Sequence, residues 1–142
     1  MPTDSNFVVL LRGVPLFVDV PDKSLEQVSA MAADVTHEAG HVIVRQGVGR
    51  AHALHVIIEG KASVSADGAR IATLGPGDYF GEIAVLDRVD RTATVTAVTQ
   101  LRLLALDATS FRRLVRSDPA LAATLPDAIS ERLRDLDEKL DG

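Results

Sequence analysis

Apolar residues recur at helical spacing through the first part of the chain. The first stripe, interrupted by Pro15, consists of Leu10, Leu11, Val14 and Phe17. The second consists of Leu25, Val28, Met31 and Ala32. Asp22 or Ser24 stands where a side chain would cap this second helix. The spacing therefore predicts helices over residues 5–35.

From His41 onward the pattern changes to short, β-branched and often alternating segments. They are Val42–Val44, His55–Ile58, Ala62–Ser65, Ile71–Leu74, Thr92–Val98 and Leu101–Leu106. Glycine-rich turn signals separate them, and Asp67-Gly68 is the clearest hairpin turn. Several short strands at this spacing predict a sandwich or a barrel.

After Asp107 the helical period returns. Ala108–Val115 predicts a short helix, Ser117-Asp118-Pro119 predicts a break, and a last helix begins near Pro126. The apolar stripe of that last helix is Ile129, Leu133, Leu136 and Leu140. We expect one domain over residues 1–142: N-terminal helices over 1–36, a strand-rich middle over 37–107 and C-terminal helices over 108–142. The fold class is mainly β with flanking α.

Composition narrows the class of protein. A chain of 142 residues can bury its own core, and the absence of cysteine excludes disulfides and thiolate metal sites. The net charge of −5 argues against a general nucleic-acid surface, and Arg112, Arg113 and Arg116 are expected on a solvated helix face. No apolar run approaches the roughly 18 residues of a membrane span. We expect a cytoplasmic protein without membrane contact.

Residues 77–95 carry the most informative chemistry. Gly81 permits a close backbone approach, and Ile83–Leu86 could form one helical turn whose free N–H groups face an anion. Arg91 offers a planar fork for phosphate oxygens, whereas the Glu82 carboxylate can only accept hydrogen bonds. Such a pair suits an anionic ligand that also carries hydroxyl donors.

The order of these residues resembles a known motif. It runs Phe80-Gly81-Glu82, then Ile83-Ala84-Val85-Leu86, then Arg91-Thr92-Ala93-Thr94-Val95. This resembles the phosphate-binding cassette of the cyclic nucleotide-binding domain family, which includes bacterial catabolite activator proteins and the regulatory subunits of cAMP-dependent kinase. Leu10–Phe17 and Leu54–Gly60 look like the N-terminal helix and the central strand of that family. The resemblance covers nearly the whole chain and implies a β-roll or jelly-roll barrel whose C-terminal helices act as a lid.

The resemblance also implies roles for particular residues. Glu82 would accept from the ribose 2′-hydroxyl, and Arg91 would pair with the cyclic phosphate. Backbone contacts would come from the region of Gly81, Ile83, Ala84 and Ala93. Thr92 could donate its hydroxyl to the phosphate or approach a guanine amino group. Candidate contacts to the purine, the ribose and the lid are Val64, Ile71, Arg132, Leu133 and Leu136. The implied ligand is cAMP, with cGMP as an alternative, and no catalytic residue or catalytic cofactor is implied.

Two departures from the family pattern leave the base and the affinity open. Asp90 stands where the family often has proline, and it could compete with the ligand for Arg91. Leu136-Asp137 stands where the catabolite activators offer a Thr-Ser pair to adenine.

Two other functions stay open at this point. One is a degenerate domain of the same fold that serves assembly and binds no nucleotide. The other is a cupin-like metalloenzyme, although His52, His55 and Glu59 lack the cupin His-x-His spacing, and we expect no metal. For the sensor, the expected partners are a protein effector of unknown identity and a second copy through the C-terminal helix, without direct nucleic-acid binding.

Overall fold

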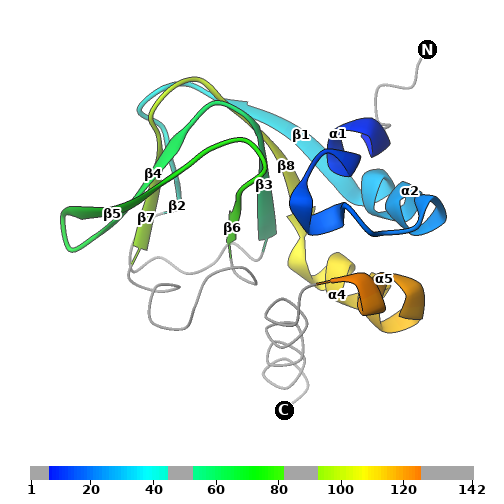
Figure 1. The fold of residues 1–142 in the computed structure, drawn as a ribbon. Helices are drawn as coiled ribbons and strands as arrows, with labels where there is room; N and C mark the ends of the chain where they lie inside the picture. The colour runs from blue at the N-terminus through cyan, green and yellow to red at the C-terminus, as the bar shows by residue number, and fades with distance from the viewer. Residues whose placement is uncertain (1–6, 45–52, 82–92, 126–142) are drawn as a thin grey trace.

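The computed structural model describes residues 7–44, 53–81 and 93–125, and their strands form two antiparallel sheets (Figure 1). The first sheet has the strand order β1 (Ala32–His37), β8 (Leu101–Asp107), β3 (Ala53–Glu59) and β6 (Tyr79–Gly81). The second has the order β2 (Val42–Val44), β7 (Ala93–Ala97), β4 (Ala62–Ala66) and β5 (Ala69–Leu74). Each of the six segments with strand-like alternation overlaps a strand of these sheets.

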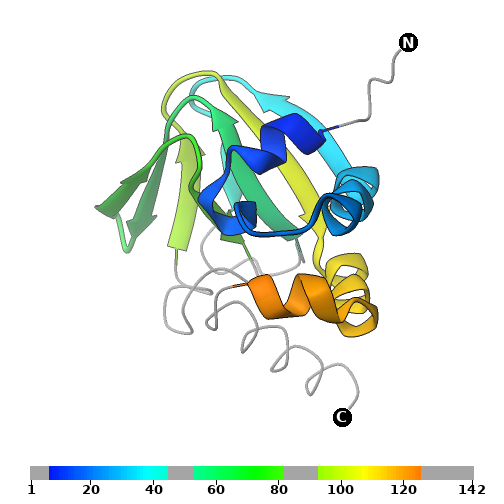
Figure 2. The same cartoon turned by 45° about the vertical axis from the view of Figure 1, so that its right-hand side comes forward.

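Helices gather against the outer face of the first sheet, as Figures 1 and 2 show. They are α1 (Val8–Arg12), the 3-10 turn η1 (Pro15–Phe17), α2 (Asp22–Met31), α4 (Ala108–Ser117) and α5 (Pro119–Thr124). Leu54 and Leu104 of the sheet are fully buried in one cluster with side chains of these helices. In the same cluster the rings of Phe17 and Phe111 meet edge to face, with centroids 6.4 Å apart. This apolar contact holds the helices on the sheet.

A second apolar cluster fills the space between the two sheets. Its buried members are Ile57, Ala62, Val64, Phe80, Val95, Ala97, Leu101 and Leu103. Alternation along β8 explains why both clusters form, because Leu101 and Leu103 belong to the inner cluster and Leu104 and Leu106 to the helix-side cluster. A sheet that is apolar on both faces confirms the expected β-roll with flanking helices.

Two tight turns show why the chain needs particular residues. The β4–β5 hairpin turns at Asp67 and Gly68, with φ of 52° and 83°, which confirms the Asp-Gly prediction. Gly60 joins β3 to β4 at a φ of 97°. A Cβ atom at Gly60 would collide with the backbone oxygen of Gln100, so both the dihedral and the space require glycine.

The N-terminal boundary differs from the sequence prediction. Helix α2 ends at Met31, and Ala32–His37 is strand β1 rather than the end of a helix. The reason is tertiary, because every residue of β1 pairs with a residue of the apolar strand β8, and that pairing outweighs helix propensity. The expected cap is also wrong: Pro21 is the N-cap of α2 and no side chain caps it.

The expected solvated arginine face is wrong for one of its three members. Arg113 and Arg116 are exposed, but Arg112 is only 8% exposed. Helix α4 packs on both α2 and α5. Sequence spacing alone did not separate this arginine from its two neighbours.

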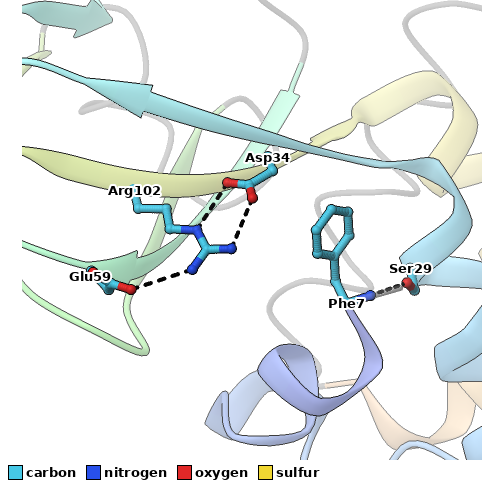
Figure 3. A network of polar contacts seen from close by, with 5 residues as sticks. All are labelled: Phe7, Ser29, Asp34, Glu59 and Arg102. Carbon is cyan, nitrogen blue, oxygen red and sulfur yellow. Dashed lines mark hydrogen bonds and ion pairs between the residues drawn. The ribbon is translucent and has the colours of Figure 1, made fainter. Parts of the chain in front are cut away.

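Hydrogen bonds and ion pairs join strands of the first sheet and connect Phe7 with helix α2 (Figure 3). Arg102 of β8 donates to both carboxylate oxygens of Asp34 on β1, at 3.1 and 2.9 Å, and to Glu59 of β3 at 3.4 Å. This guanidinium holds the pKa of the Asp34 carboxyl below its usual value, chiefly through the hydrogen bond. The backbone N–H of Phe7 donates to the Ser29 hydroxyl at 2.7 Å.

No helix within residues 7–44, 53–81 and 93–125 is long and apolar enough to cross a membrane.

Candidate functional site

The two ends of the phosphate-binding segment predicted from sequence lie on different sheets. Gly81 is the last residue of β6 and pairs with Leu54 of β3 in the first sheet. Ala93 is the first residue of β7 and pairs with Ala66 of β4 in the second sheet. The chain therefore leaves one sheet at Gly81 and joins the other at Ala93.

Most residues with a predicted ligand contact lie outside the described residues. They are Glu82, Ile83, Ala84, Arg91 and Thr92 of the cassette, and Arg132, Leu133 and Leu136 of the last helix. Their roles remain predictions. The structure places Gly81, Ala93, Val64 and Ile71.

Val64 and Ile71, the two candidate apolar contacts to the ligand, occupy different environments. Val64 is 8% exposed and belongs to the cluster between the sheets, where it pairs with Ala72 of β5 and Val95 of β7. Ile71 is 53% exposed and stands where the β4–β5 register shifts. Val64 thus lines the interior of the roll, whereas Ile71 presents apolar surface to solvent.

A tight turn fixes the strand that enters the cassette. The Asp78 side chain accepts from the backbone N–H of Gly75 at 2.8 Å. The N–H of Gly77 donates to the Ile57 carbonyl, and the N–H of Ile57 donates to the Asp78 carbonyl, both at 2.9 Å. These bonds continue the β3–β6 ladder and set the position of Gly81 at its end.

His55 is a partly buried polar residue to which the sequence analysis gave no function. It lies on β3 directly opposite Phe80 of β6, and the two rings stack with centroids 4.9 Å apart and planes 21° apart. Its Nδ1 atom is buried and has no hydrogen-bond partner among the described residues. Burial, with a smaller effect from His37, lowers the pKa of His55 to about 4, so its ring is neutral at neutral pH. Alternation along the sequence could not reveal this burial, because it puts His55 on the face opposite Leu54 and Val56, and only the second sheet makes that face an interior one.

The histidines do not assemble a metal site in the part of the chain that the structure describes. His37 and His41, with Glu38 between them, match the His-Glu-x-x-His spacing of zinc enzymes, but the string lies on a strand end and a turn rather than on a helix. The two rings stack face to face, with centroids 4.5 Å apart. Within residues 7–44, 53–81 and 93–125, no three His, Cys, Asp or Glu side chains converge as metal ligands.

Asp118 ties the N-terminal helices to the start of α5. It caps α5 by accepting from the Leu121 N–H at 3.2 Å, and it accepts from the buried Ser24 hydroxyl of α2 at 2.7 Å. The Ser24 hydrogen bond is the main reason that the pKa of Asp118 lies below its usual value. Helix α5 ends at Thr124, immediately before the residues of the predicted last helix. The predicted lid is therefore joined to an element that α2 holds in place.

Comparisons with known proteins agree with this arrangement. The family model described as the cyclic nucleotide-binding domain matches residues 34–118. A cyclic nucleotide-gated potassium channel of Rhizobium etli is 35% identical over 87% of the chain and 34% of its own length. The cAMP-dependent protein kinase regulatory subunit of Schizosaccharomyces pombe is 34% identical over 75% of the chain and 26% of its own length. The cAMP-bound PfPKA-R structure superposes with a TM-score of 0.69 at 27% identity, covering 92% of the chain and 46% of that structure.

These matches describe one domain rather than a whole relative, because the chain spans only 34% and 26% of the two curated relatives. The family match includes β6, β7 and the cassette between them. It also includes residues 34–37 of β1, a strand whose first four residues the sequence pattern alone assigned to a helix. Sequence motif, strand topology and family model converge, and the chain belongs to the cyclic nucleotide-binding domain family.

Proposed function

We propose that the chain is a sensor module that binds cAMP and acts by binding rather than by catalysis. The observation that carries this proposal is the cassette sequence between Gly81 and Ala93, which joins two sheets of the family fold. Relatives named for cAMP or for cyclic nucleotides support the ligand class. cGMP stays the alternative ligand, because the Thr92 hydroxyl could form a hydrogen bond with a guanine amino group.

In the proposed complex, Arg91 pairs with the cyclic phosphate and Glu82 accepts from the ribose 2′-hydroxyl. Backbone groups near Gly81, Ile83, Ala84 and Ala93 complete the anion site, while Thr92 donates its hydroxyl to the phosphate. Val64 and Ile71 contact the ribose and purine. A planar guanidinium and oriented N–H groups are the donors that a phosphate prefers.

The proposed output is a change in the position of the last helix. Arg132, Leu133 and Leu136 cover the base when the ligand is bound. The ligand can shift the two positions of this helix only by its different affinity for them. Burial of the phosphate and of the base supplies that difference, and slower amide exchange of residues 126–142 in the presence of cAMP is the expected readout.

Calorimetric titration with cAMP and cGMP tests the proposal. The wild type should bind cAMP, and Arg91→Ala should weaken that binding by roughly 10- to 150-fold, the cost of about 1.5–3 kcal/mol for a hydrogen bond to a charged group. Arg113→Ala is the matched control, because this arginine is exposed on α4. Both arginines lose the same side chain, but only one lies in the cassette.

Three outcomes decide between the hypotheses. Binding of cAMP that depends on Arg91 supports the sensor. Absence of heat and of thermal shift with both nucleotides, together with a concentration-dependent oligomer, would identify a domain used for assembly. Equal affinities in Arg91→Ala and Arg113→Ala would contradict the assigned phosphate contact.

The wider setting belongs to the same proposal. We expect a cytoplasmic location, a protein effector that responds to the last helix, and no direct contact with nucleic acid. The apolar stripe of that helix also suits a homodimer. Light scattering with and without cAMP checks the oligomeric state.

A further inference from the structure

His55 is a partly buried polar side chain that the proposed function leaves unused. Its strand position is fixed on both sides, by Phe80 of β6 and by Ala105 of β8. Phe80 is 3% exposed and belongs to the cluster between the sheets, so the stacked His55 ring faces the same interior. Val64, a candidate ligand contact, belongs to that cluster too.

The stacked pair of His55 and Phe80 lies next to the start of the cassette. Phe80 precedes Gly81, and Gly81 pairs with Leu54, the residue before His55. The segment proposed to hold the ligand therefore starts one residue after Phe80, the ring on which His55 packs. The geometry connects the histidine to the site through the β3–β6 ladder.

The Nδ1 atom makes this position unusual. Buried polar atoms in native proteins are nearly always hydrogen-bonded to protein or to ordered water, so an exception requires an explanation, and a partner that arrives with a ligand supplies one. An apolar aromatic ring would stack on Phe80 equally well without burying an unpaired nitrogen. Packing alone therefore does not explain a histidine here.

We propose that His55 is a ligand-positioning residue whose Nδ1 forms its hydrogen bond only when the cyclic nucleotide is bound, with the nucleotide itself or with a water molecule that it fixes. This inference rests on the proposed function and adds a residue outside the cassette to the site. The ring stack orients the imidazole in both states. The Nδ1 atom, which has no partner among the described residues, becomes a source of affinity when the nucleotide is bound.

Two substitutions separate the hydrogen bond from the stack. His55→Phe keeps an aromatic ring against Phe80 and removes the nitrogen. His55→Asn keeps a polar atom close to the place of Nδ1 and removes the ring. Each variant of the full chain is titrated with cAMP by calorimetry at pH 7.5, and its thermal midpoint is measured without ligand.

The proposal expects opposite patterns in the two variants. His55→Phe should bind cAMP about three- to tenfold more weakly, as the loss of one net hydrogen bond predicts, with an unchanged or higher midpoint. His55→Asn should lose thermal stability yet stay within about twofold of the wild-type affinity, because it retains a hydrogen-bonding atom. A structural role alone would instead make affinity follow stability.

Other outcomes overturn the inference. Wild-type affinity in His55→Phe would show that Nδ1 contributes nothing to binding, and equal weakening in both variants would assign the effect to the ring. Failure of the wild type to bind either nucleotide would remove the proposed function, and this inference with it. A wild type that binds cAMP while His55→Phe binds equally well would remove the inference alone.

Discussion

Acid should destabilise the free protein through His55 before it titrates the carboxylates. The perturbation is a proton on a ring that the fold keeps neutral. The neighbours on the flanking strands, Phe80 and Ala105, carry no charge, and the charge of His37 on β1 opposes protonation further. Charging His55 therefore has to work against burial without a compensating anion among the described residues.

The size of the effect follows from the pKa. A value lowered from 6.5 to about 4 means that the folded protein binds the proton less tightly than the unfolded chain, by roughly 3 kcal/mol. Because the folded pKa is the lower one, this stabilisation is fully present above pH 6.5 and is lost as the pH falls towards 4. Between pH 7.5 and pH 5 the expected loss is about 2 kcal/mol.

Urea unfolding at pH 7.5, 6 and 5 measures this loss in the wild type and in His55→Phe. The variant lacks the titrating ring, so its free energy of unfolding should fall by about 2 kcal/mol less than that of the wild type over this range. The values at pH 7.5 serve as the internal reference for changes in packing. Parallel pH curves for the two proteins would refute the reasoning, because they would show that His55 is not the group that titrates.

Further predictions concern the residues that hold the fold. Gly40→Ala should lower the free energy of unfolding by about 1–2 kcal/mol, because the φ of 92° at this position disfavours alanine although the space around it is open. Gly60→Ala should lower it by about 1–3 kcal/mol more, because the added Cβ also collides with backbone. Thermal midpoints of the two variants test this, and equal costs would contradict the collision. Asp118→Ala should lower the free energy of unfolding in urea by about 1 kcal/mol through loss of the helix cap, and an unchanged value would show that the cap contributes nothing. Asp34→Asn should cost less than about 1 kcal/mol, and the cost should shrink in high salt, because its ion pair with Arg102 is partly exposed.

Local sequence signals were sufficient where a strand carries enough buried apolar residues to show an alternation or a continuous run. β3, β4 and β8 were predictable because their apolar residues alternate or run together between glycine turns. β1 was not predictable, because Ala32 and Ala33 continue the composition of α2 and the strand forms only against β8. β6 has three residues, too few to show a period, and it depends on its ladder with β3.

The candidate site likewise contains residues that the sequence could identify and residues that only the fold brings together. The cassette could be recognised because its residues are close together in sequence and in a fixed order. His55 could not be connected with it, because the contact with Phe80 joins positions that only strand pairing brings side by side. Ser24 was expected to cap its own helix and instead binds Asp118, a partner distant in sequence.

The attachment of the cassette to two different sheets has a kinetic consequence. A nucleotide held by residues 82–92 would sit between strands that must separate when the roll opens, since Gly81 leaves one ladder and Ala93 enters another. Such a ligand would act as a removable cross-link and would slow unfolding as well as shift its equilibrium. The lifetime of the folded domain, and hence its resistance to proteolysis, would then vary with the concentration of the signal itself.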